Sequence, residues 1–182
     1  HLDRLMLCGF YNRCRRPLHF IGSSIGAWRF AALCQDHALP ALDRFRLAYI
    51  HQSYDHKPSP VEVTAESRRV MDAYVDAAGI DQILGHPHYR LGILAVRCRH
   101  LTACEDRLRM GAGLLAAVLA NLIHRNGLRF FFLRGLFADA RGRFPLDAAT
   151  ALPLQQFMLH TGNFKDALLA SGSIPLVMSG VR

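Results

Sequence analysis

A run of small residues between an apolar segment and a helical one constrains the fold of this chain more than any other feature. Residues Leu18–Ile21 have the composition of a strand that enters a core, and from Ile25 to Gln35 the apolar residues recur at helical spacing. The sequence GSSIG, residues 22–26, joins the two segments. The pattern G-x-S-x-G in a strand-to-helix turn is typical of hydrolases that present a nucleophilic serine.

Ser24 is the central residue of this pattern and the candidate catalytic nucleophile. An ordinary serine hydroxyl is a poor nucleophile, so an enzyme holds it exposed, beside a base and near donors for an oxyanion. Gly22 and Gly26 are expected to leave room for the sharp turn. The helix that starts at Ile25 is expected to point its N-terminal N–H groups at the site, and Ser23 to turn away from it.

The rest of the chain alternates between strand-like and helix-like segments. Strands are predicted over 89–98, over 129–137 with its centre at residues 130–132, and over 155–160. The end of a helix is predicted over 5–11, and whole helices are predicted over 41–54 and 110–124. Another helix is predicted to start at a capping box formed by Ser59 and Glu62 and to stop at Gly79. A last helix is predicted to start at an Asn163 cap and to end near Gly172. This order predicts an α/β protein whose mostly parallel sheet is covered on both faces, forming one domain over residues 1–182.

One apolar run bears on the membrane question. The segment Gly111–Ile123 is 13 residues long, which is too short to span a bilayer, and it is therefore predicted to be a buried helix. The formal net charge is +8, but the basic residues are scattered, with the densest group at Arg13, Arg15 and Arg16. This spread argues against a dedicated nucleic-acid site and is compatible with weak attraction to an anionic membrane surface.

The cysteines give no sign of a disulfide framework or a metal centre. There are five, an odd number, and the pairs Cys8/Cys14 and Cys98/Cys104 lack the usual C-x-x-C spacing of zinc sites. Reduced thiols in a cytoplasmic protein are therefore expected, with peripheral membrane contact compatible with the charge. No metal and no cofactor is predicted.

The order of residues also permits a catalytic triad. Asp139 follows one predicted strand and His160 follows the next, so the order serine, acid, histidine is that of an α/β-hydrolase. The chain has ten histidines, and none of them stands out as a base. A third alternative is a basic domain that binds lipid or a partner and keeps the turn only as an element of its fold.

Two segments together resemble the patatin-like phospholipase family. GSSIGAWR, residues 22–29, resembles the family's nucleophile elbow, and ALLASGSIP, residues 167–175, resembles its ASxxIP segment. The two segments bracket about 150 residues in the family's order. The resemblance implies a three-layer α/β/α fold and a lipid acyl hydrolase whose substrate is a lipid or another acyl ester.

The resemblance also implies a Ser–Asp dyad in which Ser24 attacks the ester and an aspartate activates it directly. The family carries this aspartate in an Asp-Gly motif, and this chain contains no Asp-Gly pair. The motif is therefore expected beyond Arg182, and the family's glycine-rich oxyanion loop before His1. On this view the 182 residues are a central portion of the domain and are inactive by themselves.

Overall fold

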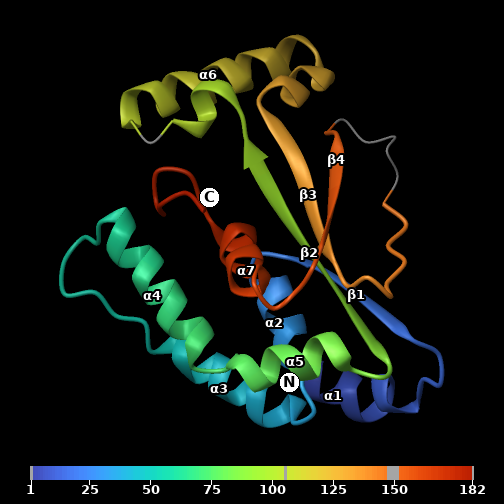
Figure 1. Cartoon of the computed structure of the whole chain (residues 1–182). Helices are drawn as coiled ribbons and strands as arrows, with labels where there is room; N and C mark the ends of the chain where they lie inside the picture. Colours follow the sequence, from blue (N-terminus) through green and yellow to red (C-terminus); the bar gives the residue numbers. More distant parts are fainter. Residues whose placement is uncertain (1, 105, 147–151, 182) are drawn as a thin grey trace.

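Four strands form one open sheet in the order β1-β2-β3-β4 (Figure 1). The computed structural model describes residues 2–104, 106–146 and 152–181. The strands within these residues are β1 (Leu18–Ser23), β2 (Tyr89–Cys98), β3 (Phe132–Ala138) and β4 (Leu154–Met158). β1 is parallel to β2 and β3 is parallel to β4, whereas β3 runs antiparallel to β2. The predicted α/β class with a mostly parallel sheet is confirmed.

Seven α-helices accompany the sheet in the described residues. They are α1 (Leu2–Gly9), α2 (Ile25–Leu33), α3 (Ala38–Ile50), α4 (Pro60–Asp72), α5 (Ala77–Gly85), α6 (Arg107–Ile123) and α7 (Phe164–Gly172). Three 3-10 helices join them: η1 (Tyr11–Arg13), η2 (His100–Ala103) and η3 (Arg125–Phe130). The capping box predicted for α4 is confirmed, because Ser59 N donates to Glu62 Oε2 at 2.7 Å and Glu62 N to Ser59 Oγ at 3.3 Å.

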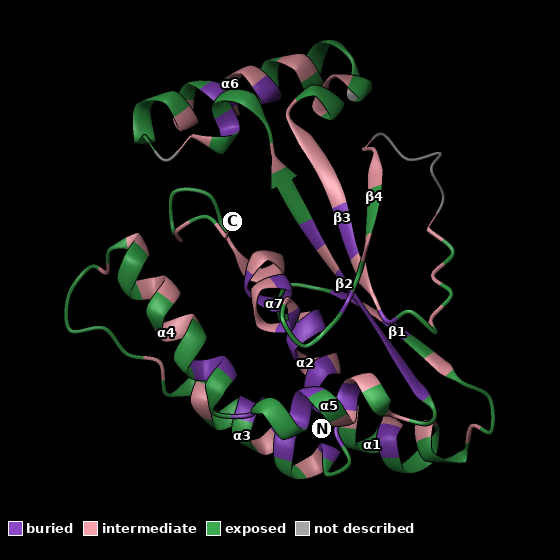
Figure 2. Cartoon of the chain, viewed as in Figure 1, coloured by how far each residue is buried: buried purple, intermediate pink, exposed green. Residues whose placement is uncertain are grey.

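The hydrophobic core lies between the sheet and the helices on one of its faces. Helices α2 and α7 pack against β1 and β2, and α3 and α4 pack in turn against α2 and α7. Phe20, Trp28, Ile93 and Leu168 are all buried in this core, which Figure 2 shows at the crossing of α2, α7 and β2. The layers are compatible with an α/β/α arrangement.

The other face of β1 and β2 is covered by the chain that follows β3. A Cβ on Gly92 would lie 2.8 Å from the ring of Phe144, and that ring also contacts His19. Arg143 N donates to His19 Nδ1 at 2.9 Å, which holds this segment across the sheet. Alternate residues of β1 therefore meet a helical core on one side and an aromatic loop on the other.

Three local predictions are wrong. The helix that starts at Pro60 ends at Asp72, and Gly79 lies inside the next helix, where the side chain of Asp76 caps its N–H at 2.7 Å. The strand expected from residue 129 starts only at Phe132, because residues 125–130 form η3, and Phe130 is exposed. Asn163 precedes α7 but makes no side-chain cap, since its amide bonds His160 N and Met158 O.

The prediction that residues 111–123 form a buried helix is also wrong. The helix exists as α6, but only Gly113 and Ala117 are buried, and Leu122 and Ile123 are 75% and 86% exposed. Figure 2 shows most of α6 as exposed or intermediate, at the far end of β2 from α5. Apolar composition indicated burial, but α6 packs mainly on the short helices η2 and η3. Within the described residues, no helix combines the length and the apolar character needed to cross a membrane.

Candidate active site

The turn between β1 and α2 holds Ser24 in a conformation that side-chain-bearing residues rarely adopt. Ser24 has φ 52° and ψ −134°, and it is exposed at the carboxyl end of β1. Backbone of this kind costs about 1–3 kcal/mol and persists where the surrounding structure imposes it. Ser23 is exposed on the face of β1 opposite to Phe20 and Gly22, as expected for a spacer.

The two glycines of GSSIG have different roles. A Cβ on Gly22 would lie 2.6 Å from the Ala27 backbone nitrogen and 2.8 Å from the Ala27 Cα, so α2 approaches the strand closely only because Gly22 has no side chain. A Cβ on Gly26 would meet no described atom within 4 Å. The expectation that both glycines make room for the turn therefore holds for Gly22 and not for Gly26.

The start of α2 presents backbone donors next to Ser24. The carbonyl of Ser24 accepts the N–H groups of Ala27 at 3.0 Å and Trp28 at 3.2 Å. The N–H groups of Ile25 and Gly26 precede them in the first turn, where an α-helix offers no acceptor of its own, and they have no partner among the described residues. Two N–H donors and the positive end of the helix dipole are suited to a developing oxyanion.

Helix α7 fixes the turn from the other side through Ser171. Ser24 N donates to Ser171 Oγ at 2.8 Å, and Ser171 Oγ donates to the Leu94 carbonyl of β2 at 2.6 Å. Nearby, the indole Nε1 of Trp28 donates to Leu168 O at 2.9 Å. Ser171 thus joins the turn, α7 and β2, a role that its place in the sequence did not reveal. The two segments quoted for the family resemblance are in contact here, although 147 residues separate Ser24 from Ser171.

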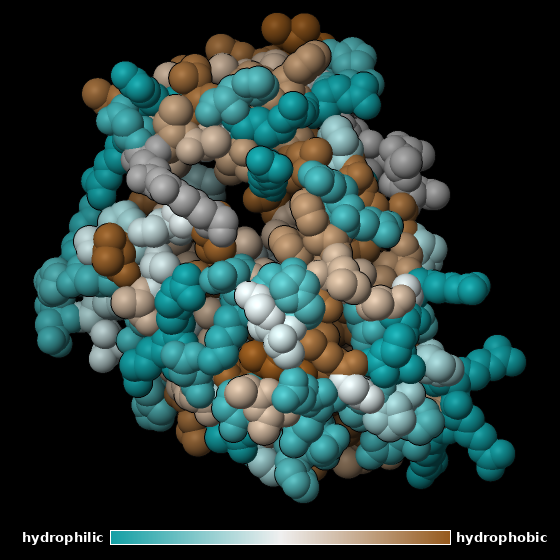
Figure 3. All heavy atoms as spheres, in the orientation of Figure 1, coloured by the Kyte–Doolittle hydropathy of each residue, from teal (hydrophilic) through white to brown (hydrophobic). Residues whose placement is uncertain are grey.

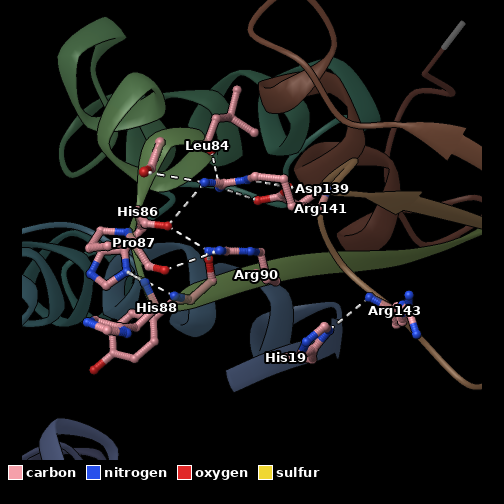
Figure 4. A network of polar contacts seen from close by, with 11 residues as sticks. His19, Leu84, His86, Pro87, His88, Arg90, Asp139, Arg141 and Arg143 are labelled. Carbon is pink, nitrogen blue, oxygen red and sulfur yellow. Dashed lines mark hydrogen bonds and ion pairs between the residues drawn. The ribbon is translucent and has the colours of Figure 1, made fainter. Parts of the chain in front are cut away.

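Asp139 belongs to a network of polar contacts that does not include Ser24. Its carboxylate receives Arg141 Nη2 at 2.7 Å and Nε at 3.0 Å, and Figure 4 shows Arg141 reaching on toward Leu84 and His86. Burial acts to raise the pKa of Asp139, but the hydrogen bonds and charge of Arg141, with the charge of Arg90, together lower it below its usual value. The ion pair keeps this carboxylate ionised. Arg141 also donates to the carbonyls of Leu84 and His86, which ties the segment after β3 to the end of α5.

The register of the sheet separates Asp139 and His160 from Ser24. Asp139 N bonds Leu91 O, which lies three residues, or about 10 Å, before Leu94 along β2. His160 precedes α7, whose opposite end carries the partner of Ser24, and the nine residues of that helix span about 13 Å. The structure therefore does not bring these two residues to the candidate nucleophile. The aspartate expected beyond Arg182 lies outside the described residues.

A cleft lies at the other end of β1 and β2 from Ser24. It has a volume of about 720 Å³ and is lined by residues that include Tyr11, Gln35, His37 and His86. Burial is the main cause that lowers the pKa of His86, whose ring stacks on Tyr89 with centroids 4.1 Å apart. Among the described residues, no three His, Cys, Asp or Glu side chains lie close enough to hold a metal ion.

No protein-family model matches the chain, and neither a curated protein nor a solved structure matches it.

Proposed function

We propose that this chain belongs to a serine acyl-ester hydrolase of the patatin-like phospholipase type, with Ser24 as its nucleophile and lipids as its substrates. The observation that carries the proposal is the backbone of Ser24, which is strained, exposed and placed between a strand and the first turn of α2. A strained residue that presents a hydroxyl at the carboxyl end of a parallel strand is typical of a catalytic turn.

In the proposed reaction, Ser24 Oγ attacks the ester carbonyl and its proton passes to an aspartate. The carbonyl oxygen becomes an oxyanion, and the N–H groups of Ile25 and Gly26 in the first turn of α2 are proposed to stabilise it. The alcohol then leaves with the proton, and water hydrolyses the acyl-serine to release the fatty acid and restore the hydroxyl. The aspartate is proposed to follow Arg182, and the glycine-rich loop is proposed to precede His1. The fold is proposed to be the patatin-like α/β/α fold, and the protein to be cytoplasmic and membrane-peripheral.

The dyad is favoured over the Ser24/Asp139/His160 triad by the positions of the other two residues. Asp139 is bound to Arg141, and His160 Nδ1 accepts Gly162 N at 3.2 Å in an exposed loop. A base acts only within hydrogen-bond reach of the hydroxyl it deprotonates. In the protein with its flanking residues, His160→Ala is expected to leave esterase activity intact, and complete loss of activity would favour the triad.

A fluorophosphonate probe tests the nucleophile directly, because it reacts with an activated serine hydroxyl and not with an ordinary one. The experiment uses the protein with its flanking residues, and peptide mapping by mass spectrometry locates the label. Labelling is expected at Ser24 and is expected to disappear in Ser24→Ala. Ser23→Ala is the matched control, since it removes a neighbouring exposed hydroxyl and should leave labelling unchanged.

Two results would overturn the proposal. A folded protein that takes no label at Ser24 would favour the binding domain, in which the turn serves only the fold. A label on Ser23 would mean that the other serine faces the site. Circular dichroism of each variant establishes that the protein remains folded.

A further inference from the structure

The exposed side of α6 is an apolar surface for which the described residues provide no cover. Its members are Leu108, Leu115, Val118, Leu119, Leu122 and Ile123. Of these, Leu108, Leu115, Leu119 and Leu122 repeat at spacings of seven, four and three, so they form one stripe along the helix. At 17 residues the helix is about 25 Å long, and a helix that is apolar on its outward side requires an apolar neighbour.

Close backbone packing holds α6 in this position. A Cβ on Gly113 would lie 2.7 Å from Thr102 N of η2, and a Cβ on Gly127 of η3 would lie 2.8 Å from the Ala120 carbonyl. Thr102 Oγ1 in turn donates to Arg99 O at 2.6 Å. The helix is thus fixed to the ends of β2 and β3, and its apolar stripe faces outward.

Arginines surround this surface, although they are scattered in the sequence. Residues 97–133 contain six arginines and two acidic residues, so they carry half of the chain's net charge of +8. Arg97, Arg99, Arg107, Arg109 and Arg129 are all exposed. Figure 3 shows hydrophobic residues along the upper edge of the molecule, where Figure 1 places α6, with hydrophilic residues beside them. A hollow of about 470 Å³ is lined by residues that include Arg97, Arg99 and His100.

We propose that α6 and the arginines around it dock this protein on an anionic phospholipid membrane. The helix lies in the plane of the interface with its leucine stripe among the acyl chains, while the arginines contact lipid phosphates. A second copy of the chain is a poorer occupant, because a symmetric contact would bring the same arginines together. The only described acidic residue of this region is Asp106, and its side chain already caps Arg109 N at 3.0 Å.

The parallel direction of β1 and β2 places this surface at the same end of the sheet as Ser24. The docking therefore deepens the proposed function and rests on it. β1 and β2 are parallel, and Ser23 pairs with Leu94. β2 continues for four more residues, about 13 Å, to Cys98, and the chain then leads through η2 to α6. The α6 surface therefore lies beyond the turn at the same end of the sheet. Docking through α6 therefore presents the Ser24 end of the molecule to the membrane.

Vesicle sedimentation tests the docking independently of catalysis. The 182-residue chain is mixed with phosphatidylcholine vesicles, or with vesicles that also contain phosphatidylglycerol. Binding is expected only or mainly to the second kind and is expected to weaken as salt rises. Arg107→Gln with Arg109→Gln should weaken it about thirtyfold, from the contribution of two basic residues near an anionic surface. Arg44→Gln with Arg46→Gln on α3 removes the same charge elsewhere and should have a much smaller effect.

The leucine stripe is tested in the same assay. Leu119→Glu should weaken binding about tenfold or more, because it places a charge where an apolar side chain enters the lipid. Leu5→Glu on α1 is the control, since Leu5 is 70% exposed outside the α6 region and should have little effect. The tryptophan introduced by Leu119→Trp should shift its emission to the blue when anionic vesicles are added, and the tryptophan introduced by Leu5→Trp should not. Both tryptophan variants are compared with the unmodified chain, whose Trp28 is buried.

Other outcomes overturn the docking. Equal binding to neutral vesicles would refute the role of the arginines, and equal losses in Leu119→Glu and Leu5→Glu would refute the role of α6. A lipid-free dimer that Leu119→Glu dissociates, with no vesicle binding, would assign the surface to a second copy. Ser24→Ala must bind vesicles as the unmodified chain does, so a failed probe reaction refutes the proposed function without refuting the docking.

Discussion

Replacing Gly22 by alanine tests the turn around Ser24, and Gly26→Ala is its matched control. Both substitutions add one methyl group to the same five-residue sequence. At Gly22 the new Cβ would lie 2.6 Å from Ala27 N, 2.8 Å from Ala27 Cα and 2.8 Å from Gly26 C. These are backbone atoms, so relief requires the first turn of α2 to move away from β1. At Gly26 the methyl group would meet no described atom within 4 Å.

The two substitutions should change the free energy of unfolding in opposite directions. Overpacking of this kind typically costs about 1–3 kcal/mol, and Gly22→Ala is expected to lower the free energy of unfolding by about that amount. In a chain of this size each kcal/mol shifts Tm by about 2–4 °C, so the melting temperature should fall by about 2–12 °C. Gly26→Ala replaces glycine inside a helix and should raise stability by at most about 1 kcal/mol.

Urea unfolding followed by circular dichroism and by tryptophan fluorescence measures both values. Trp28 is the single tryptophan, it is buried, and its indole bonds Leu168 O, so its emission reports the packing of α2 on α7. Loss of fluorophosphonate labelling in a folded Gly22→Ala protein would connect the turn to reactivity. Equal effects of the two alanines, or a stable Gly22→Ala protein, would show that α2 does not approach the strand at this residue.

Three further predictions concern stability and reactivity. Asp139→Asn should lower the free energy of unfolding at neutral pH by about 1–3 kcal/mol, because Arg141 loses its partner. The pKa of Asp139 is lowered in the folded state. The carboxylate therefore contributes its full stabilisation above its unfolded pKa of about 4, and this stabilisation is lost as pH falls through the folded pKa. Urea titrations at neutral and acidic pH should therefore converge for the two proteins. Ser171→Ala leaves Ser24 N and the Leu94 carbonyl without their partner and should lower the free energy of unfolding by about 1–3 kcal/mol. Ser171→Thr keeps a hydroxyl and should retain part of that stability. Burial raises the pKa of Cys34, so iodoacetamide should modify exposed Cys8 in the native protein and Cys34 only after unfolding.

Local sequence patterns predicted the elements that local chemistry specifies. The capping box at Ser59 and Glu62 fixed the start of α4, and the β-branched run from Tyr89 to Cys98 gave a strand with those bounds. The turn at Ser24 was predicted because GSSIG lies between a strand pattern and a helix pattern. In each case the information lies within a few residues of the element.

The sequence did not predict features that depend on long-range packing. The apolar composition of α6 indicated burial, but a helix is buried only where the fold supplies a neighbour, and α6 lies beyond the core at the ends of β2 and β3. Ser171 could not be identified as the partner of Ser24, because their contact depends on how α7 crosses β2. Asp139 and His160 had the right order for a triad, but the strand register separates them from the turn.

The direction of one pair of strands connects the two proposals. Because β1 and β2 are parallel, the turn at Ser24 and the connection from Cys98 to α6 lie at the same end of the sheet. An antiparallel pair would have placed the apolar helix about a strand's length away, at the end where Tyr89 pairs with Leu18. The strand direction, which the sequence pattern alone does not specify, therefore brings the proposed nucleophile and the proposed docking surface to the same side of the molecule. A hydrolase that acts on bilayer lipids requires this arrangement, whereas a serine turn retained only for folding does not.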